Sequence, residues 1–117
     1  MKTLHITHNG QPNQFIVSKK QVSKNKVLKT SVLYDKIESS ANTSLGFYPD
    51  ASHFSCNNIE FDQLNNAYLN DKLVIKNNIK KLSTTEIIFN ITVSKKEEKQ
   101  QHLICTAIFG YTIQKAC

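Results

Sequence analysis

Alternation of apolar and other side chains with a period of two dominates the second half of the chain. Four runs carry this pattern, at residues 54–61, 72–80, 87–94 and 102–113. A period of two turns successive side chains to opposite faces of a strand, so each run is expected to present one face to a core. The side chains expected on that face of the last three runs are Leu73, Ile75, Asn77 and Ile79; Ile87, Phe89, Ile91 and Val93; and Leu103, Cys105, Ala107, Phe109, Tyr111 and Ile113. The short links at residues 82–85 and 95–101 predict antiparallel pairing of the strands that they join.

One amphipathic helix is predicted ahead of these strands, at about residues 30–44. Its apolar positions recur every four residues, at Leu33, Ile37, Ala41 and Leu45, and form a stripe that would be buried. Thr30 or Ser31 is expected to cap the start. Gly46 stands where a helix C-terminus favours a residue with positive φ.

The segment before the helix is predicted to be less regular. Residues 3–8 and 14–17 look extended, and the turn-forming residues between them would let residues 1–13 form a hairpin or a loose leader. Residues 19–29 are polar, lack a clear period and indicate a loop.

Together, these elements predict one α+β domain that spans residues 1–117. A single helix can be buried by four antiparallel strands and one earlier strand only if the sheet wraps around it, which is the hotdog arrangement with five or six strands. Such a sheet keeps an edge strand and an apolar flank, so we expect a homo-oligomer, a dimer or possibly a tetramer.

Charge narrows the range of partners. The net charge is +6, the first 34 residues hold six lysines and no acid, and the chain has no arginine. Arginine is the residue that most often binds bases and phosphates through two hydrogen bonds at once. Aromatic residues, on which bases would stack, do not alternate with the lysines. The sequence therefore argues against nucleic-acid binding. A solvated lysine surface is the simplest interpretation, and a phosphate-bearing ligand or an acidic protein partner are the alternatives.

Cysteines and hydropathy bear on the compartment. Cys56 and Cys105 lie in strand patterns and are expected in the core, while the odd number of cysteines favours a reduced, cytoplasmic setting. The sequence contains no apolar run of membrane-spanning length and no signal peptide at its start. It predicts no metal site and no cofactor.

Over residues 14–114 the chain resembles the hotdog thioesterases of the 4-hydroxybenzoyl-CoA thioesterase and acyl-CoA thioester hydrolase type. The matching positions are Val17 in the first strand, Val27-Leu28 after the loop, Glu38 at the helical glutamate, Ile59-Glu60-Phe61 at the end of a strand, and Asn70-Asp71-Lys72-Leu73, which looks like the Gly-Asp-x-Leu turn of that family. The resemblance implies a hotdog fold and an acyl thioester as ligand.

The catalytic motif of these enzymes is degenerate in this chain. Ser23 stands where the family has its catalytic aspartate, and Lys26 stands at the glycine of the loop. The helical arginine corresponds to Ala41 or Asn42, and Lys29-Thr30-Ser31 replace an alternative His-Gly-Gly motif. Glu38 is the acid that both motifs retain.

Thioester hydrolysis requires a carboxylate and hydrogen-bond donors for the thioester oxygen. Glu38 is the leading candidate for the acid, because it borders the apolar stripe, where partial desolvation would raise its basicity; the alternative is an exposed glutamate paired with a lysine. Asp35 is a second carboxylate, one turn earlier. Ser23 is a candidate donor near the helix start. The expected substrate-binding residues are Thr30, Ser31, Tyr34, Asn57, Asn58, Lys26 and Lys29.

Three functions therefore remain open at the level of sequence. The first is hydrolysis of an acyl thioester of coenzyme A or of an acyl carrier protein, and the second is binding of either without cleavage. The third is a hydratase or dehydratase, which would need His53 or His102 to meet Glu38.

Overall fold

The computed structural model describes residues 13–47, 53–97 and 100–114. Its elements, in chain order, are β1 (Asn13–Ile16), a short 3-10 turn η2 (Lys19–Gln21), α1 (Thr30–Leu45), β2 (His53–Gln63), β3 (Lys72–Leu82), β4 (Glu86–Lys96) and β5 (Gln101–Gln114). All predicted strands and the predicted helix that fall in these ranges are present. The extended segment predicted at residues 3–8, and with it the hairpin or leader, lies outside the described residues.

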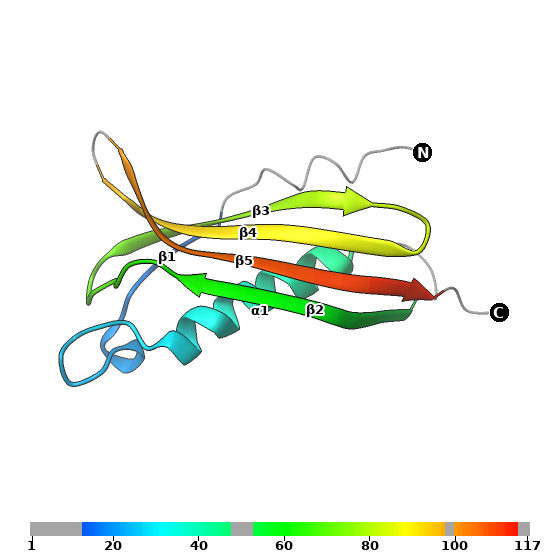
Figure 1. Cartoon of the computed structure of the whole chain (residues 1–117). Coiled ribbons are helices and arrows are strands. Elements are labelled where there is room, and N and C mark those ends of the chain that lie inside the picture. Colours follow the sequence, from blue (N-terminus) through cyan, green and yellow to red (C-terminus); the bar gives the residue numbers. More distant parts are fainter. Residues whose placement is uncertain (1–12, 48–52, 98–99, 115–117) are drawn as a thin grey trace.

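The strands form one antiparallel sheet in the order β1-β3-β4-β5-β2. Successive strands β3, β4 and β5 are neighbours, as their short links predicted, whereas β2 joins the far side of β5. Helix α1 lies along one face of the sheet (Figure 1). A single helix held by five strands confirms the hotdog arrangement. Neither helix in the described part of the chain combines the length and the apolar character of a membrane span.

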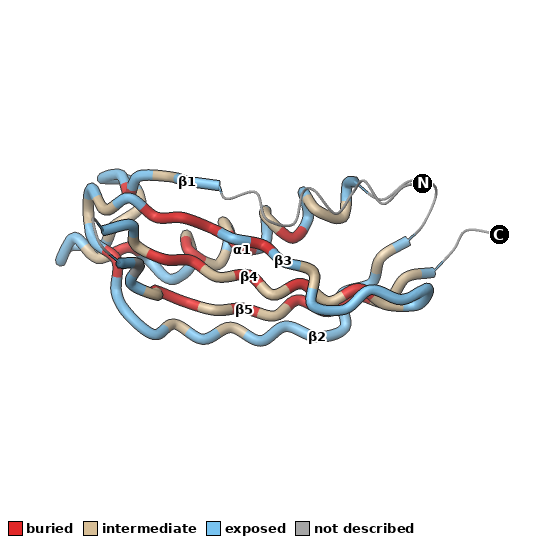
Figure 2. The backbone as a smooth tube through the Cα atoms, turned by 90° about the horizontal axis from the view of Figure 1, so that it is seen from above, coloured by how far each residue is buried: buried red, intermediate tan, exposed pale blue. Residues whose placement is uncertain are grey.

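Helix α1 is buried along the stripe that the sequence predicted. Leu33, Ile37 and Ala41 are 0% exposed, and they pack into the same core as the inner side chains of β3 and β4. Burying an aliphatic side chain of this size contributes about 1.5–3 kcal/mol, so the stripe holds the helix on the sheet. The other sides of α1 remain open to solvent (Figure 2).

Both ends of α1 differ from the prediction. Lys29, not Thr30 or Ser31, occupies the N-cap and makes no side-chain capping bond. Thr30 is the first helical residue, and its hydroxyl donates a hydrogen bond to Gln63 on β2 instead of capping the helix. At the other end Gly46 has φ −65°, not a positive value. Its backbone N–H donates to the carbonyl oxygens of Asn42 and Thr43, both at 3.2 Å, so the helical geometry continues through it.

The core follows the predicted inner face except near the start of β5, where Leu103, predicted to face the core, is only partly buried. Ile87, Phe89, Ile91 and Val93 of β4 are at most 1% exposed, as expected from the alternation. Ile104 belongs to the opposite set yet is 0% exposed. It lies at a β-bulge, because Val93 pairs with Cys105 and Ser94 pairs with Leu103, which leaves Ile104 without a partner in the ladder. Such a bulge locally re-aims side chains and breaks a strict period.

The two described cysteines differ in solvent exposure. Cys105 is buried, as predicted, and its burial raises the pKa of the thiol to about 12. The prediction that Cys56 is a core residue is wrong, because this residue is exposed. Cys56 pairs with Tyr111 and therefore faces the helix side of the sheet, but it lies in the first half of edge strand β2, whereas α1 contacts the end of this strand at Phe61 and Gln63.

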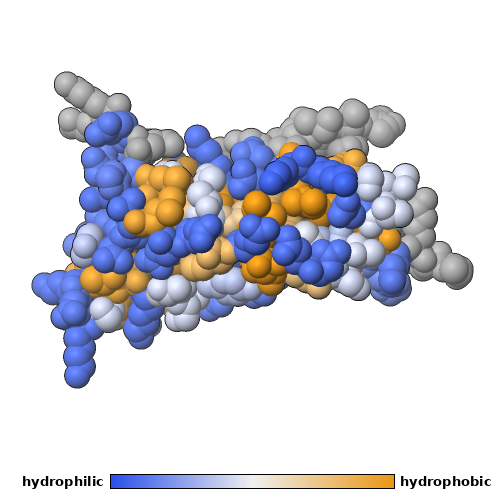
Figure 3. All heavy atoms as spheres, in the orientation of Figure 1, coloured by the Kyte–Doolittle hydropathy of each residue, from blue (hydrophilic) through white to orange (hydrophobic). Residues whose placement is uncertain are grey.

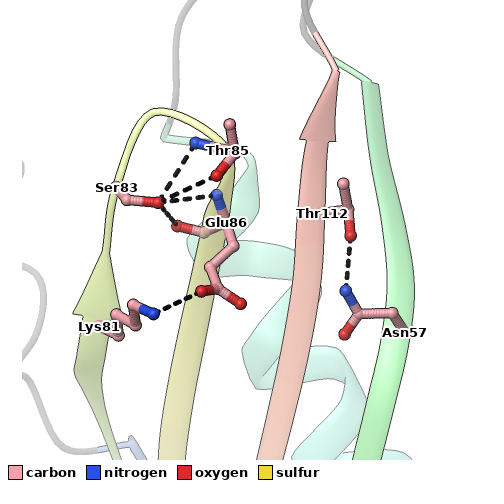
Figure 4. A network of polar contacts seen from close by, with 6 residues as sticks. All are labelled: Asn57, Lys81, Ser83, Thr85, Glu86 and Thr112. Carbon is pink, nitrogen blue, oxygen red and sulfur yellow. Dashed lines mark hydrogen bonds and ion pairs between the residues drawn. The ribbon is translucent and has the colours of Figure 1, made fainter.

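Polar side chains close the far end of the sheet (Figure 4). Ser83 Oγ accepts hydrogen bonds from the backbone N–H groups of Thr85 and Glu86, at 3.2 and 3.1 Å, in the turn between β3 and β4. Lys81 and Glu86 form an ion pair of 2.6 Å across the same turn. These contacts fix the register of the hairpin that carries the β3 and β4 core residues.

Candidate functional site

A small hairpin precedes α1 where the sequence indicated a loop. Val22 and Leu28 form an antiparallel bridge, and the Ser23 N–H donates to the Val27 carbonyl at 2.8 Å. Lys26 lies in the turn with φ 64°, and its N–H donates to the Ser23 carbonyl at 2.9 Å. We call residues 19–29 the lysine hairpin, after Lys19, Lys20, Lys24, Lys26 and Lys29, all of which are exposed.

The link between β2 and β3 holds this hairpin in place. The Leu28 N–H donates to the Ala67 carbonyl at 2.8 Å, and the Leu69 N–H donates to the Lys26 carbonyl at 3.0 Å. Asn70, in the turn that resembles Gly-Asp-x-Leu, has φ 73°. Lys26 and Asn70 are the two non-glycine residues with positive φ in the described ranges, and both stand where the resemblance placed a glycine. The loop geometry is thus kept without its glycines.

An open cavity of about 490 Å³ lies between the start of α1, the end of β2 and the link that follows β2. Its lining residues are Thr30, Gln63, Leu64, Asn65, Asn66 and Tyr68. The Thr30 hydroxyl donates to Gln63 Oε1 at 2.8 Å, and Gln63 Nε2 donates to the Asn65 carbonyl at 3.2 Å. Amide and hydroxyl groups therefore dominate the lining, beside a helix N-terminus whose first N–H groups have no partner within the helix.

A second group of side chains lies further along α1, on its side toward β5 and β2. Tyr34 packs edge-on against Phe61, with 5.8 Å between ring centroids, and lies 6.0 Å from the ring of Phe109. Glu38 follows one helical turn later on the same side. This arrangement directs Glu38 toward the β2 edge of the sheet.

The pKa values of Tyr34 and Tyr111 reflect the ionisable groups around these two side chains. Burial raises the pKa of Tyr111 to about 12, and the charges of Cys56, Glu38 and Tyr34 add to the rise. The pKa of Tyr34 is raised as well, first by burial and then by Glu38, Cys56 and Asp35. A carboxylate, a thiol and two phenols thus share the space between α1 and β2.

This space is open in the single chain. Glu38 is exposed, so the desolvation expected from the sequence is not present, and none of the ion pairs among the described residues includes it. On β2, Ile59 is 44% exposed although it pairs with the buried Phe109 and so shares the inner face of the sheet. Helix α1 packs mainly over β3 and β4 and contacts β2 at Phe61 and Gln63, which leaves the part of β2 around Cys56 and Ile59 exposed.

The two candidate regions are separate within one chain. Thr30 and Ser31 begin α1, and Glu38 comes eight residues after Thr30. At 1.5 Å of rise per residue this separation is about 12 Å along the axis. A carbonyl oxygen bound at the helix N-terminus would therefore lie too far from Glu38 of the same chain for that carboxylate to act on it.

Several predicted site residues lie away from Glu38. Ser23 belongs to the lysine hairpin, beyond the N-terminal end of α1 (Figure 1), where its hydroxyl accepts a hydrogen bond from the Asn25 N–H at 3.3 Å. Asn57 Nδ2 donates to the Thr112 hydroxyl, and Asn58 Nδ2 donates to Glu60 at 3.3 Å. These partners alternate with inward residues, so both asparagines lie on the face of the sheet opposite α1 (Figure 4). The bonds there match a structural role.

Neither His53 nor His102 forms a hydrogen bond or an ion pair with Glu38 in the described part of the chain. His53 pairs with Gln114 at the end of the sheet, and His102 pairs with Lys95 at the start of β5. The described residues contain no group of three side chains that could hold a metal ion.

Sequence reasoning missed the residues that complete these regions. Gln63, Asn65, Asn66 and Tyr68 line the cavity, and none of them was among the predicted site residues. The contact between Thr30 and Gln63 spans 33 positions, and no local pattern signals it. Cys56 was misassigned for the same reason, since only the position of α1 decides which inward residues are covered.

Neither the protein-family models nor the curated proteins contain a match to this chain. Solved structures do match it. The 4-hydroxybenzoyl CoA thioesterase from Pseudomonas sp. strain CBS-3 has a TM-score of 0.75 at 10% identity, over 92% of this chain and 86% of that one. A hexameric thioesterase from Yersinia pestis has a TM-score of 0.75 at 15% identity, over 89% and 87%.

A hypothetical thioesterase from Streptococcus pneumoniae, solved with coenzyme A, has a TM-score of 0.71 at 16% identity, over 92% of this chain and 81% of its own. Identities this low carry the fold and not the chemistry. Because the agreement covers about nine-tenths of the chain in each case, the protein has the hotdog fold that these thioesterases share.

Proposed function

We propose that this protein is a thioesterase-like hotdog protein that hydrolyses an acyl thioester, with Glu38 as its acid. The observation that carries the proposal is the position of this carboxylate on an open flank of α1, in a group with Tyr34, Tyr111 and Cys56. An acyl or aromatic group would pack on the tyrosines and on Ile59. Coenzyme A, bound by the Streptococcus pneumoniae protein of the same fold, supports a thioester of this carrier as the substrate class.

The reaction would use Glu38 in one of two ways. As a base it takes a proton from a water molecule while the water oxygen bonds to the thioester carbon; as a nucleophile it forms that bond itself, and water later hydrolyses the resulting anhydride. In both, the negative charge that develops on the carbonyl oxygen needs donors. We assign this role to the backbone N–H groups near Thr30 and Ser31. In the base route the carbon–sulfur bond then breaks, and the thiol leaves with the proton that Glu38 took from water. In the nucleophile route this bond breaks as the anhydride forms, and the departing thiolate takes its proton from solvent.

A second copy of the chain would complete this site, because the donors and the acid are about 12 Å apart in one copy. Edge strand β2 has unpaired backbone groups and the exposed inward residues Cys56 and Ile59, which supports extension of the sheet by another β2. We propose a homodimer as the smallest active unit, with tetramers and larger assemblies as its multiples. We expect it in the cytoplasm, where the free thiols stay reduced.

The second candidate is a hotdog protein that binds the thioester without cleaving it. Ser23, at the position of the family aspartate, has a hydroxyl that supports its own turn, and Lys26 keeps the loop geometry in place of glycine. A chain that has lost its catalytic loop residues and kept the loop is consistent with binding alone.

Release of free thiol from short, long and aromatic acyl-CoA substrates tests the proposal. Glu38→Gln keeps the size of the side chain and removes the carboxylate, so we expect kcat/KM to fall by about 100-fold or more. Glu60→Gln is the matched control, since Glu60 is an exposed glutamate on the opposite face of the sheet. Equal turnover in wild type and Glu38→Gln would overturn the role of Glu38. Saturable binding of acyl-CoA without turnover in any form would support the binder.

A further inference from the structure

The lysine hairpin concentrates positive charge that the rest of the described chain does not neutralise. Its five lysines are exposed, and residues 13–34 contain no aspartate or glutamate. None of the five takes part in an ion pair among the described residues, whereas Lys81 pairs with Glu86 and Lys95 pairs with Asp71. The five positive charges repel one another, and binding of a negatively charged partner would reduce this repulsion.

We propose that the lysine hairpin docks the acidic surface of a carrier protein, which presents its acyl group on a pantetheine arm. This inference rests on the proposed function for the acyl thioester, and it specifies how that thioester arrives. The partner is a macromolecule with clustered carboxylates, and the hairpin is the part of the chain that recognises it.

Shape favours an acidic protein over a free phosphate group. The hairpin projects from the body beyond the start of α1 (Figure 1), and the same corner of the molecule is hydrophilic (Figure 3). The five lysines are distributed along this projecting segment, and none of them lines the described cavity. Lysines are point charges on flexible stems, and without an arginine fork they suit dispersed carboxylates better than bidentate capture of one phosphate.

The lysine hairpin is also fixed next to a cavity that could hold the pantetheine arm. Val27 forms a bridge with Tyr68, and Lys29 immediately precedes Thr30, so the hairpin is joined to two residues that line the 490 Å³ cavity. The amide and hydroxyl groups of the lining suit the amides of a pantetheine arm. Leu64 and Tyr68, which are 53% and 48% exposed, add apolar area at the rim. Docking at the hairpin would thus lead the arm toward the start of α1.

Binding of a purified bacterial acyl carrier protein in its apo form, which has no arm and no thioester, tests the docking alone. We expect the double variant Lys20→Glu/Lys24→Glu to weaken this binding by about tenfold, because it places like charges opposite the carboxylates. Lys76→Glu/Lys80→Glu on the exposed side of β3 makes the same change in net charge and should bind as the wild type does. Affinity of the wild type should also fall as salt rises.

Hydrolysis of acyl-CoA by the same variants separates this inference from the proposed function. Loss of carrier binding in the hairpin variant with unchanged acyl-CoA turnover supports docking. If no acyl thioester is hydrolysed but carrier binding still depends on the hairpin, docking stands and the hydrolase fails. Absence of carrier binding, or equal loss in the β3 control, overturns the docking proposal. A raised KM for acyl-CoA with carrier binding intact also overturns it and assigns the hairpin to the phosphates of coenzyme A.

Discussion

The two described thiols should differ sharply in reactivity because only one lies under the helix. Cys56 is exposed on the inner face of β2, and Cys105 is buried with a pKa of about 12. Since thiolate is the reactive form, about one part in ten thousand of the Cys105 thiol is ionised at pH 8. We expect iodoacetamide to modify Cys56 in the native protein and to spare Cys105, as read by mass spectrometry of the alkylated peptides.

The pH dependence of this protection has a definite sign. Burial disfavours the thiolate, so the native state holds the proton of Cys105 above the ordinary pKa of 9.0. The stability linked to this thiol is complete below pH 9 and is lost as pH rises toward about 12. Modification of Cys105 should accelerate over that window or after denaturation. Rapid native modification at pH 8 would show that the core around β4 and β5 opens readily.

At the scale of the element, α1 separates the residues that stabilise the fold from those available for chemistry. Ile37 is 0% exposed, and Glu38, the next residue, is exposed. We expect Ile37→Ala to lower the free energy of unfolding by about 2–5 kcal/mol, because it leaves a cavity under the helix. Glu38→Ala should change it by no more than about 0.5 kcal/mol. Urea unfolding of the two variants measures both values.

The unfolding of these two variants also serves as a stability control for the activity experiment on Glu38. If Glu38→Ala destabilises the fold as much as Ile37→Ala, then a loss of turnover in a Glu38 variant reflects unfolding and carries no information on catalysis. A stable, inactive Glu38 variant is the combination that assigns a chemical role.

At the scale of the whole molecule, edge strand β2 should govern association. Ile59 is 44% exposed on the inner face of this strand. In the proposed dimer it approaches the second copy, so Ile59→Lys should raise the dissociation constant of the dimer by about tenfold or more. Sedimentation equilibrium measures this constant. Leu82→Lys is the control, since Leu82 is 46% exposed at the distant end of β3.

Comparing the Ile59 and Leu82 variants also identifies which surface forms the dimer interface. Unchanged association of the Ile59 variant would exclude β2 as the contact. Weakened association of the Leu82 variant would instead place the contact at the turn between β3 and β4.

The sequence by itself determined the main helix and strands, the pairing of β3 with β4 and of β4 with β5, and the buried stripe of α1. Period-two runs predict strands, and a spacing of four residues predicts Leu33, Ile37 and Ala41 as a single face, because both patterns reflect backbone geometry that is local. The same reasoning failed where a contact across the chain overrode a local preference. Thr30 bonds Gln63 instead of capping its helix, and Gly46 continues the helix through its own backbone bonds.

Only the tertiary structure decided the environment of the candidate site. Glu38 was found from its position beside the stripe, but its exposure, its grouping with Cys56 and Tyr111, and its distance from the helix start depend on where α1 lies over the sheet. The cavity likewise joins residues from α1, β2 and the following link. Secondary structure follows from neighbours along the chain, whereas a site follows from neighbours in space, which depend on the packing of the whole chain.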